Sequence, residues 1–436
     1  MTTLHPLSHG TPLSEFDIFS VPPTQLSVVN DIETEHRPLL PMSNDRLAVF
    51  EFTTAPNEYV KWTETEIYMK LRIKLTALQG AVEFKRTDWE KIKTEPNFMH
   101  TMIQSLNLSI NGRVVTKSSI TYPYRAFVDT LIGYSDDAKE SHLSSILWTK
   151  NPARMMPRAT ATDLTVGEYF ELRGKLCLDL AQQGRAMVGG CTFKLELRFN
   201  NPEMAFTRPA DLKYNIDWDI SNLTLLVHRT VVSDGTLAAH IRALQHATAK
   251  YPITRHEIKT VTVNAGLMDV MLDSIFTGQL PRRILVGFVK ASAFRGSFTR
   301  ELFNFEHLNI NHLSFNIDGR SYPRAPYTPD FENELFMREY YSCLQTFNQD
   351  TISPVFTLSM EDYLESRAFF CYNFAPDLSD GYGVGGYLNL IKSGSLGMHV
   401  RFTKQTPEPY IAIVFAEFDN LIQIDKNNQV TTDYII

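Results

Sequence analysis

Similar short segments recur in the two halves of this 436-residue chain, in the same order and at nearly the same spacing. LSINGR (residues 108–113) is followed by Tyr-Pro at 122–123, and LSF with DGR (residues 313–320) is followed by Tyr-Pro at 322–323. Near the end of each half, LDL and LRF match LNL and VRF; the equivalent positions Arg198 and Arg401 lie 203 residues apart. Repeats that keep their order indicate a duplicated unit. The chain is therefore predicted to contain two similar domains of about 200 residues each.

Strand patterns dominate both halves. Phe193, Leu195, Leu197 and Phe199 alternate with charged residues, which is typical of a strand with one buried face. Aromatic residues make up 11% of the chain and favour strands over helices. The other predicted strands cover residues 48–53, 67–75, 106–110, 113–116, 223–232, 258–263, 284–289, 308–317, 398–402 and 411–424.

Helical periodicity is limited to two segments, residues 124–134 and 236–249, and neither belongs to a repeated strand-helix alternation. An all-β fold is therefore predicted. Domains of this size with about eight strands are jelly rolls more often than barrels. We predict two tandem jelly-roll β-sandwich domains (a double jelly roll), residues 45–208 and 209–436, with a few short helices between strands.

Residues 1–44 carry six of the 22 prolines and are predicted to form an extended N-terminal arm. Four apolar residues cluster in the arm: Phe16, Ile18, Phe19 and Val21. Such a cluster is unfavourable in water, so it should pack either on its own domain or on a neighbouring subunit. We predict that this cluster forms an inter-subunit contact.

Charge and composition exclude several functions. Lys and Arg number 42 against 49 Asp and Glu, a net charge of −7, so sequence-specific or general nucleic-acid binding is not expected. Membrane insertion is not expected either, because no apolar stretch approaches the roughly 20 residues that a spanning helix needs. The N-terminus lacks a secretion signal, which predicts a reducing compartment and free thiols at all four cysteines. These are Cys177, Cys191, Cys343 and Cys371.

Motifs for catalysis, metals and cofactors are weak. No His-x-His pair occurs, and the nearest histidine pairs, His307 with His312 and His240 with His246, have spacings that do not share a face. Residues 381–386 match GxGxxG but lie in a loop context without a following helix. Arg282-Arg283 could bind an anion or a carboxylate, and is expected at a surface turn. We predict no enzyme activity, no metal and no cofactor.

Two alternative functions each make a specific demand on the chain. A metal-dependent bicupin-type enzyme would require a bound transition metal. A glycan-binding or spike protein would require an exposed aromatic platform, for which Tyr322, Tyr327 and Tyr382 are candidates, and a secretion or receptor-display context.

Several long blocks resemble the major capsid proteins of Polinton (Maverick) elements and adintoviruses, and they run from near the first residue to near the last. The blocks are residues 14–25, 121–140, 247–263, 276–289, 303–336 and 414–425. The resemblance implies a double jelly-roll protein whose homotrimer forms a pseudo-hexameric capsomer. It implies an icosahedral virion shell enclosing DNA, with neighbouring capsomers and a single jelly-roll penton protein as partners. The chain would be made in the host cytoplasm, and the family offers no catalytic or cofactor residues.

Overall fold

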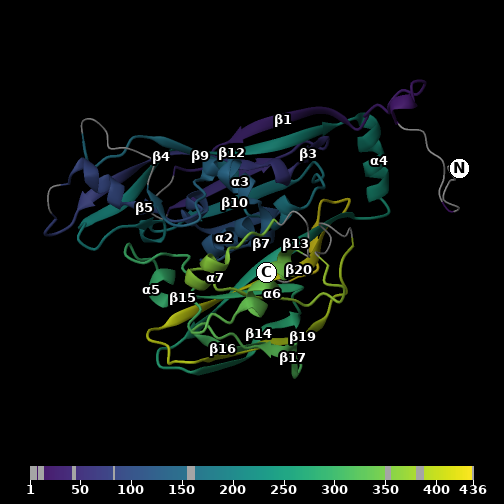
Figure 1. The fold of residues 1–436 in the computed structure, drawn as a ribbon. Helices are drawn as coiled ribbons and strands as arrows, with labels where there is room; N and C mark the ends of the chain where they lie inside the picture. The colour runs from purple at the N-terminus through teal and green to yellow at the C-terminus, as the bar shows by residue number, and fades with distance from the viewer. Residues whose placement is uncertain are drawn as a thin grey trace.

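The computed structural model describes residue 7 and residues 14–41, 46–81, 84–154, 163–348, 355–379 and 387–434. Two β-sandwiches follow one another along the chain, and Figure 1 shows the first above the second. Every pairing between two named strands is antiparallel. Both sandwiches are therefore built from antiparallel sheets.

The first sandwich contains two main sheets. One has the order β1-β12-β4-β9, with β3 also paired to β12, and the other has the order β2-β10-β6-β7. The strands are β1 (Val28–His36), β2 (Leu47–Thr53), β3 (Glu58–Val60), β4 (Glu66–Ala77), β6 (Ile103–Ile110), β7 (Arg113–Lys117), β9 (Phe170–Lys175), β10 (Thr192–Phe199) and β12 (Tyr214–Val232). A small sheet beside it joins β11 (Phe206–Thr207), β5 (Lys93–Thr94) and β8 (Ala153–Arg154).

The second sandwich has the sheets β13-β20-β15-β18, with β21 also paired to β20, and β14-β19-β16-β17. Its strands are β13 (Ala249–Val263), β14 (Asp269–Gln279), β15 (Arg283–Lys290), β16 (Ile310–Ile317), β17 (Arg320–Tyr327), β18 (Phe370–Asn373), β19 (Ser393–Phe402), β20 (Tyr410–Ile424) and β21 (Val430–Thr432).

The two sandwiches share one topology. If the eight principal strands of each are numbered along the chain, both sandwiches have one sheet ordered 1-8-3-6 and one ordered 2-7-4-5. The repeated Asn111-Gly112 and Asp318-Gly319 pairs lie at equivalent hairpins, β6–β7 and β16–β17, and all four residues have positive φ. The predicted double jelly roll is confirmed.

Helices lie mainly in the connections between strands, and both sandwiches place two α-helices between their fifth and sixth principal strands. The α-helices are α1 (Phe98–Thr101), α2 (Tyr122–Gly133), α3 (Asp136–Glu140), α4 (Asp234–Leu244), α5 (Ala291–Phe294), α6 (Met337–Asn348) and α7 (Met360–Glu365). The 3-10 helices are η1 (Ser14–Phe16), η2 (Trp62–Glu64), η3 (Arg86–Lys91), η4 (His142–Ile146), η5 (Asp179–Gln182) and η6 (Pro202–Met204). Among the described helices, none combines the length and the apolar character that crossing a bilayer requires.

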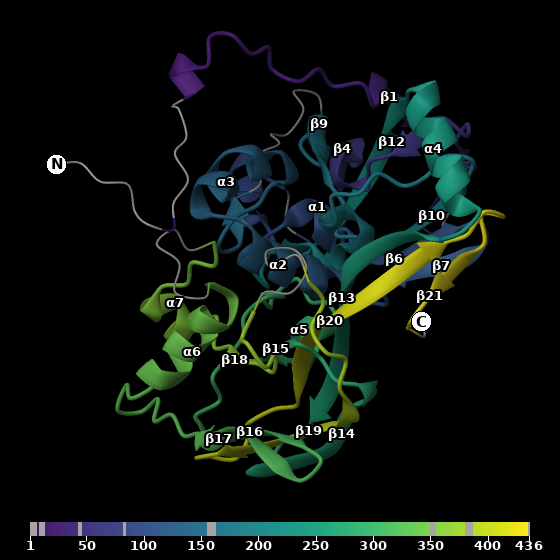
Figure 2. The same cartoon turned by 90° about the vertical axis from the view of Figure 1, so that its right-hand side faces the viewer.

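Helix α2 joins the two sandwiches. It belongs to the first by sequence, yet Tyr124, Phe127 and Leu131 pack in the core of the second. The rings of Phe127 and Phe303 stack with their centroids 4.3 Å apart. In Figure 1 and Figure 2 the helix lies between the two sets of sheets. Consecutive residues of a strand point to opposite faces, so the continuous burial along β15 and most of β20 shows that both faces of their sheet are covered.

Three segments differ from the sequence-based expectations. Strand β1 lies inside the predicted arm. Strand β12 pairs with β1 and β4, so the first sandwich extends to Val232, beyond the expected domain boundary at 208/209. Helix α4 ends at Leu244 instead of 249, because Ala249 already begins β13. Pro252 lies within β13, an edge strand where a missing N–H is tolerated.

A glycine that precedes β10 provides a test of close packing in the first sandwich. A Cβ atom on Gly189 would lie within 3.0 Å of the backbone carbonyl oxygens of Ala55, Pro56 and Glu58. Backbone atoms yield less readily than side chains, so Gly189→Ala is expected to lower the free energy of unfolding by about 1–3 kcal/mol. Urea denaturation measures the change. The matched control Gly184→Ala, whose Cβ would meet no atom within 4 Å, should leave the midpoint nearly unchanged; equal effects of the two variants would contradict the prediction.

Candidate functional site

The apolar cluster of the N-terminal arm is exposed in the single chain. Phe16, Ile18, Phe19 and Val21 are 71, 74, 93 and 88% exposed. Figure 1 and Figure 2 show the purple arm that carries them running outside both sandwiches. The arm joins the body where the N–H of Ser233 donates to the carbonyl oxygen of Ser27, 3.0 Å away. The arm therefore offers an apolar surface, and the inter-subunit contact stays a prediction.

A second candidate is a buried group of charged residues at the junction of the sandwiches, called the junction cluster below. Every side chain in it is at most 11% exposed. Burying charges is unfavourable unless each has a partner of opposite sign. The first sandwich contributes Arg125, Asp129 and Asp179, and the second contributes His256, Arg282, Arg283, Glu417 and Asp419.

Asp179 connects the two sandwiches directly. Its Oδ1 accepts hydrogen bonds from Arg125 Nη2 at 2.6 Å and from the backbone N–H of His256 at 3.2 Å. Beside it, Oδ1 of Asp129 lies 2.9 Å from Nδ1 of His256. Helix α2 and η5 thus hold strand β13 of the second sandwich through charged contacts as well as through apolar packing.

Glu417 is the central carboxylate of the second sandwich's part of the cluster. Its Oε2 accepts from Arg283 Nε at 2.6 Å and from Arg282 Nη2 at 2.9 Å, and Arg282 Nη1 lies 3.0 Å from Oδ1 of Asp419. Burial alone would raise the pKa of Glu417, but Arg283, Arg282 and His256 outweigh it and lower the pKa to about 2. The prediction that Arg282-Arg283 lie at a surface turn is wrong, because both side chains are buried. Both arginines bind carboxylates, which was the alternative function considered for them.

A further contact across the junction involves Glu95, which is 1% exposed. Its Oε2 accepts the backbone N–H of Leu302 from the second sandwich at 3.1 Å. Nearby, Arg367 donates to the carbonyl oxygens of Phe303 at 2.6 Å and of Lys150 at 2.7 Å. Burial raises the pKa of Glu95 to about 8.

The raised pKa of Glu95 predicts a stability loss with rising pH. Between pH 4.5 and 8 the folded chain keeps this proton while the unfolded chain releases it, so the free energy of unfolding should fall across that window and level off above pH 8. The contribution is on the order of 5 kcal/mol. Glu95→Gln should remove this component of the pH profile, as measured by urea denaturation from pH 5 to 9. The exposed Glu168→Gln should retain it; parallel profiles for the Glu95→Gln variant and the unaltered chain would contradict the prediction.

A cleft of about 960 Å³ opens beside the junction cluster and is lined by residues of both sandwiches. Its wall includes His100, Tyr134, Phe347 and Val355 together with members of the cluster. Burial lowers the pKa of His100 to about 4, so this histidine is neutral near pH 7. The members of the junction cluster on this wall pair with one another: Arg282 and Arg283 contact Glu417, and His256 contacts Asp129.

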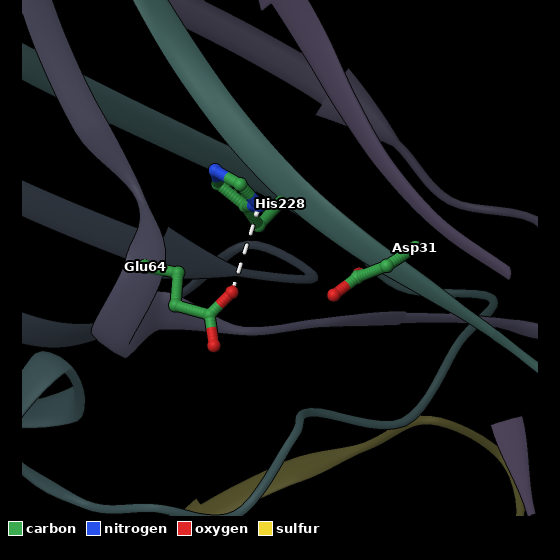
Figure 3. Close-up of side chains that lie close together, drawn as sticks. All are labelled: Asp31, Glu64 and His228. Carbon is green, nitrogen blue, oxygen red and sulfur yellow. Dashed lines mark ion pairs between the residues drawn. The ribbon is translucent and has the colours of Figure 1, made fainter.

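One group of side chains has the composition of a metal site. Asp31, Glu64 and His228 place their ligand atoms within 4.8 Å of one another on the exposed face of the first sandwich (Figure 3). Nζ of Lys61 already lies 2.7 Å from Asp31 and 3.6 Å from Glu64, and the hydrogen bond from Lys61 is the main cause that lowers the pKa of Asp31. The Lys61 ammonium supplies the positive charge that balances the two carboxylates, so this group is a surface ion-pair cluster.

The remaining motifs can be placed individually. His240 pairs with the Tyr59 hydroxyl at 2.9 Å, and His307 Nδ1 accepts the backbone N–H of Asn309 at 3.1 Å. Tyr327 is buried, so it cannot belong to an exposed aromatic platform. Tyr382 and the GxGxxG segment at 381–386 lie outside the described residues. The cysteines are free, with Cys177 half-buried and Cys191, Cys343 and Cys371 buried.

Comparisons with known proteins link this fold to viral shells. No family model matches the sequence. The uncharacterized protein F54H12.2 of Caenorhabditis elegans is 23% identical over 346 residues, which cover 78% of this chain and 81% of that protein. Among solved structures, the Sputnik virophage structure matches with a TM-score of 0.62 and 12% identity, over 98% of this chain and 93% of the other.

Two further structures have the same fold. The PBCV-1 virus capsid matches with a TM-score of 0.61 and 9% identity, over 96% of this chain and all of the other. The mavirus major capsid protein matches with a TM-score of 0.55 and 11% identity, over 99% and 95% of the two chains. At these identities the likeness establishes the double jelly-roll fold.

Proposed function

We propose that this chain is a major capsid protein of the Polinton and adintovirus type, and that its homotrimer forms a pseudo-hexameric capsomer of an icosahedral shell enclosing DNA. The observation that carries the proposal is the identical strand order of the two sandwiches within one chain. The likeness to virophage and PBCV-1 capsid structures over nearly the whole of both chains supports it.

The duplication suits a particular kind of assembly. Two similar sandwiches in each of three chains place six similar β domains around a three-fold axis, so such a trimer can occupy a position with six neighbours. The junction supports this role, because α2 and the junction cluster hold the two sandwiches together through apolar packing and hydrogen bonds.

The partners and location follow from the same proposal. The trimer would contact neighbouring capsomers in the virion and a single jelly-roll penton protein at the vertices, after synthesis in the host cytoplasm. Catalysis is not part of the proposed function.

Light scattering and negative-stain electron microscopy of the purified chain test the proposal together. Three chains of 49.8 kDa give about 149 kDa, and particles of that mass should have a pseudo-hexagonal outline. A species that stays at the mass of one chain at all concentrations would contradict the trimer. A stoichiometric transition metal in the same peak would instead favour the bicupin-type alternative.

A further inference from the structure

Two buried cysteines of the second sandwich lie next to each other. Sγ of Cys343, on helix α6, is 2.8 Å from Sγ of Cys371, on strand β18. The two residues are 0% and 1% exposed. They are 28 positions apart in the sequence, and no sequence motif pairs them. A disulfide has an S–S bond of about 2.05 Å, so only a small approach separates this dithiol from the bonded state.

The backbone around the two thiols is held in place by a tyrosine. The Tyr327 hydroxyl donates to the carbonyl oxygen of Cys371 at 2.8 Å and lies 2.7 Å from the hydroxyl of Ser342, the residue before Cys343. Tyr327 is itself 2% exposed. One buried hydroxyl therefore bridges α6 and β18 beside the sulfur atoms and fixes the distance between the two elements.

We propose that Cys343 and Cys371 are a redox pair, a dithiol in the reducing cell that hydrogen peroxide oxidises to an intrachain disulfide. One thiolate attacks the peroxide, the O–O bond breaks, and a sulfenic acid and one water form after protonation. The other thiol attacks the sulfenic sulfur, the S–S bond forms, and a second water leaves. The two sulfurs lose two electrons, and the peroxide takes up these electrons and the two thiol protons.

The surroundings determine the expected rate. Burial raises the pKa of Cys371 well above its ordinary value, so the thiolate is scarce near neutral pH. Oxidation should be slow at pH 7 and faster at pH 9. Hydrogen peroxide is small enough to reach the buried thiols during brief local openings of the fold. A larger disulfide oxidant would need a wider opening.

The expected consequence is a covalent link between α6 and the edge strand β18. A disulfide stabilises chiefly by restricting the unfolded chain, and here it would close a loop of 28 residues. The oxidised chain should melt about 2–6 °C higher than the reduced chain. This inference is independent of the proposed function.

The test uses the full-length chain, treated with hydrogen peroxide, then unfolded in excess maleimide and analysed by mass spectrometry. We expect two blocked thiols in place of four, a mass lower by two hydrogen atoms before blocking, and a peptide pair that joins Cys343 to Cys371. A thiol reductant should restore all four thiols and the lower melting temperature.

Matched variants identify the pair. Cys343→Ser and Cys371→Ser should keep every remaining thiol free, whereas Cys177→Ser and Cys191→Ser should still form the link. Four free thiols in the folded, peroxide-treated chain would overturn the proposal. A disulfide to Cys177 or Cys191, or sulfinic acid at Cys343 without a disulfide, would overturn it as well. Mass spectrometry of the unaltered chain detects both of these products.

Discussion

Replacing Glu417 with alanine is expected to lower the free energy of unfolding by about 3–5 kcal/mol. The substitution leaves the guanidinium groups of Arg282 and Arg283 buried without the carboxylate that both of them contact. Removing one partner of a buried pair costs more than the pair contributes, because the remaining charge stays desolvated. Urea denaturation followed by circular dichroism measures the loss.

Acid should reproduce part of this effect in the unaltered chain. The pKa of Glu417 is lowered from its ordinary 4.5 to about 2, so its contribution is complete above pH 4.5 and is lost as the pH falls from there towards 2. In the Glu417→Ala variant this component of acid destabilisation should be missing. The exposed Glu365→Gln serves as the control and should retain both the stability and the acid profile. A Glu417→Ala variant with an unchanged urea midpoint would show that the junction cluster does not stabilise the fold.

Deleting residues 1–25 is expected to abolish shell formation while leaving folded trimers. The deletion removes Phe16, Ile18, Phe19 and Val21 but ends before β1, so the first sandwich keeps all its strands. Buried apolar side chains contribute about 1.5–3 kcal/mol each, so four of them could supply a substantial part of a contact between capsomers. Light scattering measures the trimer, and electron microscopy of assembly reactions measures the shells.

A substitution series separates the apolar cluster from the length of the arm. The quadruple replacement of the cluster by serine should behave like the deletion. Leu39→Ser with Leu40→Ser, which removes two other exposed apolar side chains of the predicted arm range, should assemble normally. Normal shells from the truncated chain would refute the docking role, and an unfolded truncated chain would indicate that the arm packs on its own sandwich.

The duplicated architecture could be predicted because its signals are local. Alternating strands such as β10 and the paired hairpin turns lie within a few residues of sequence. Strand β1 escapes prediction because it is an exposed edge strand with the polar sequence VVNDIETEH, which lacks an apolar alternation. Helix α6 was not predicted either. The predicted strand at 258–263 begins later than β13, because β13 contains Pro252, and a proline argues against a strand unless the strand lies at a sheet edge.

The junction cluster could not be predicted from local patterns, because its members meet only after both sandwiches fold. Asp179 and His256 are 77 residues apart in sequence, and Arg283 and Glu417 are 134 apart. One signal was available. Glu417 and Asp419 are the two carboxylates in the mostly apolar segment 411–424, and a carboxylate within a buried strand needs a cationic partner.

The insertion of α2 into the second core has a consequence for synthesis of the chain on the ribosome. Phe127 is made long before Phe303, the ring on which it stacks. At ordinary elongation rates the delay is on the order of ten seconds or more. During that interval the apolar face of α2 lacks its partner and is available to chaperones or to other nascent chains. Production of this protein should therefore depend on translation speed and on chaperone supply, even though its first sandwich can pair all of its strands before the second is complete.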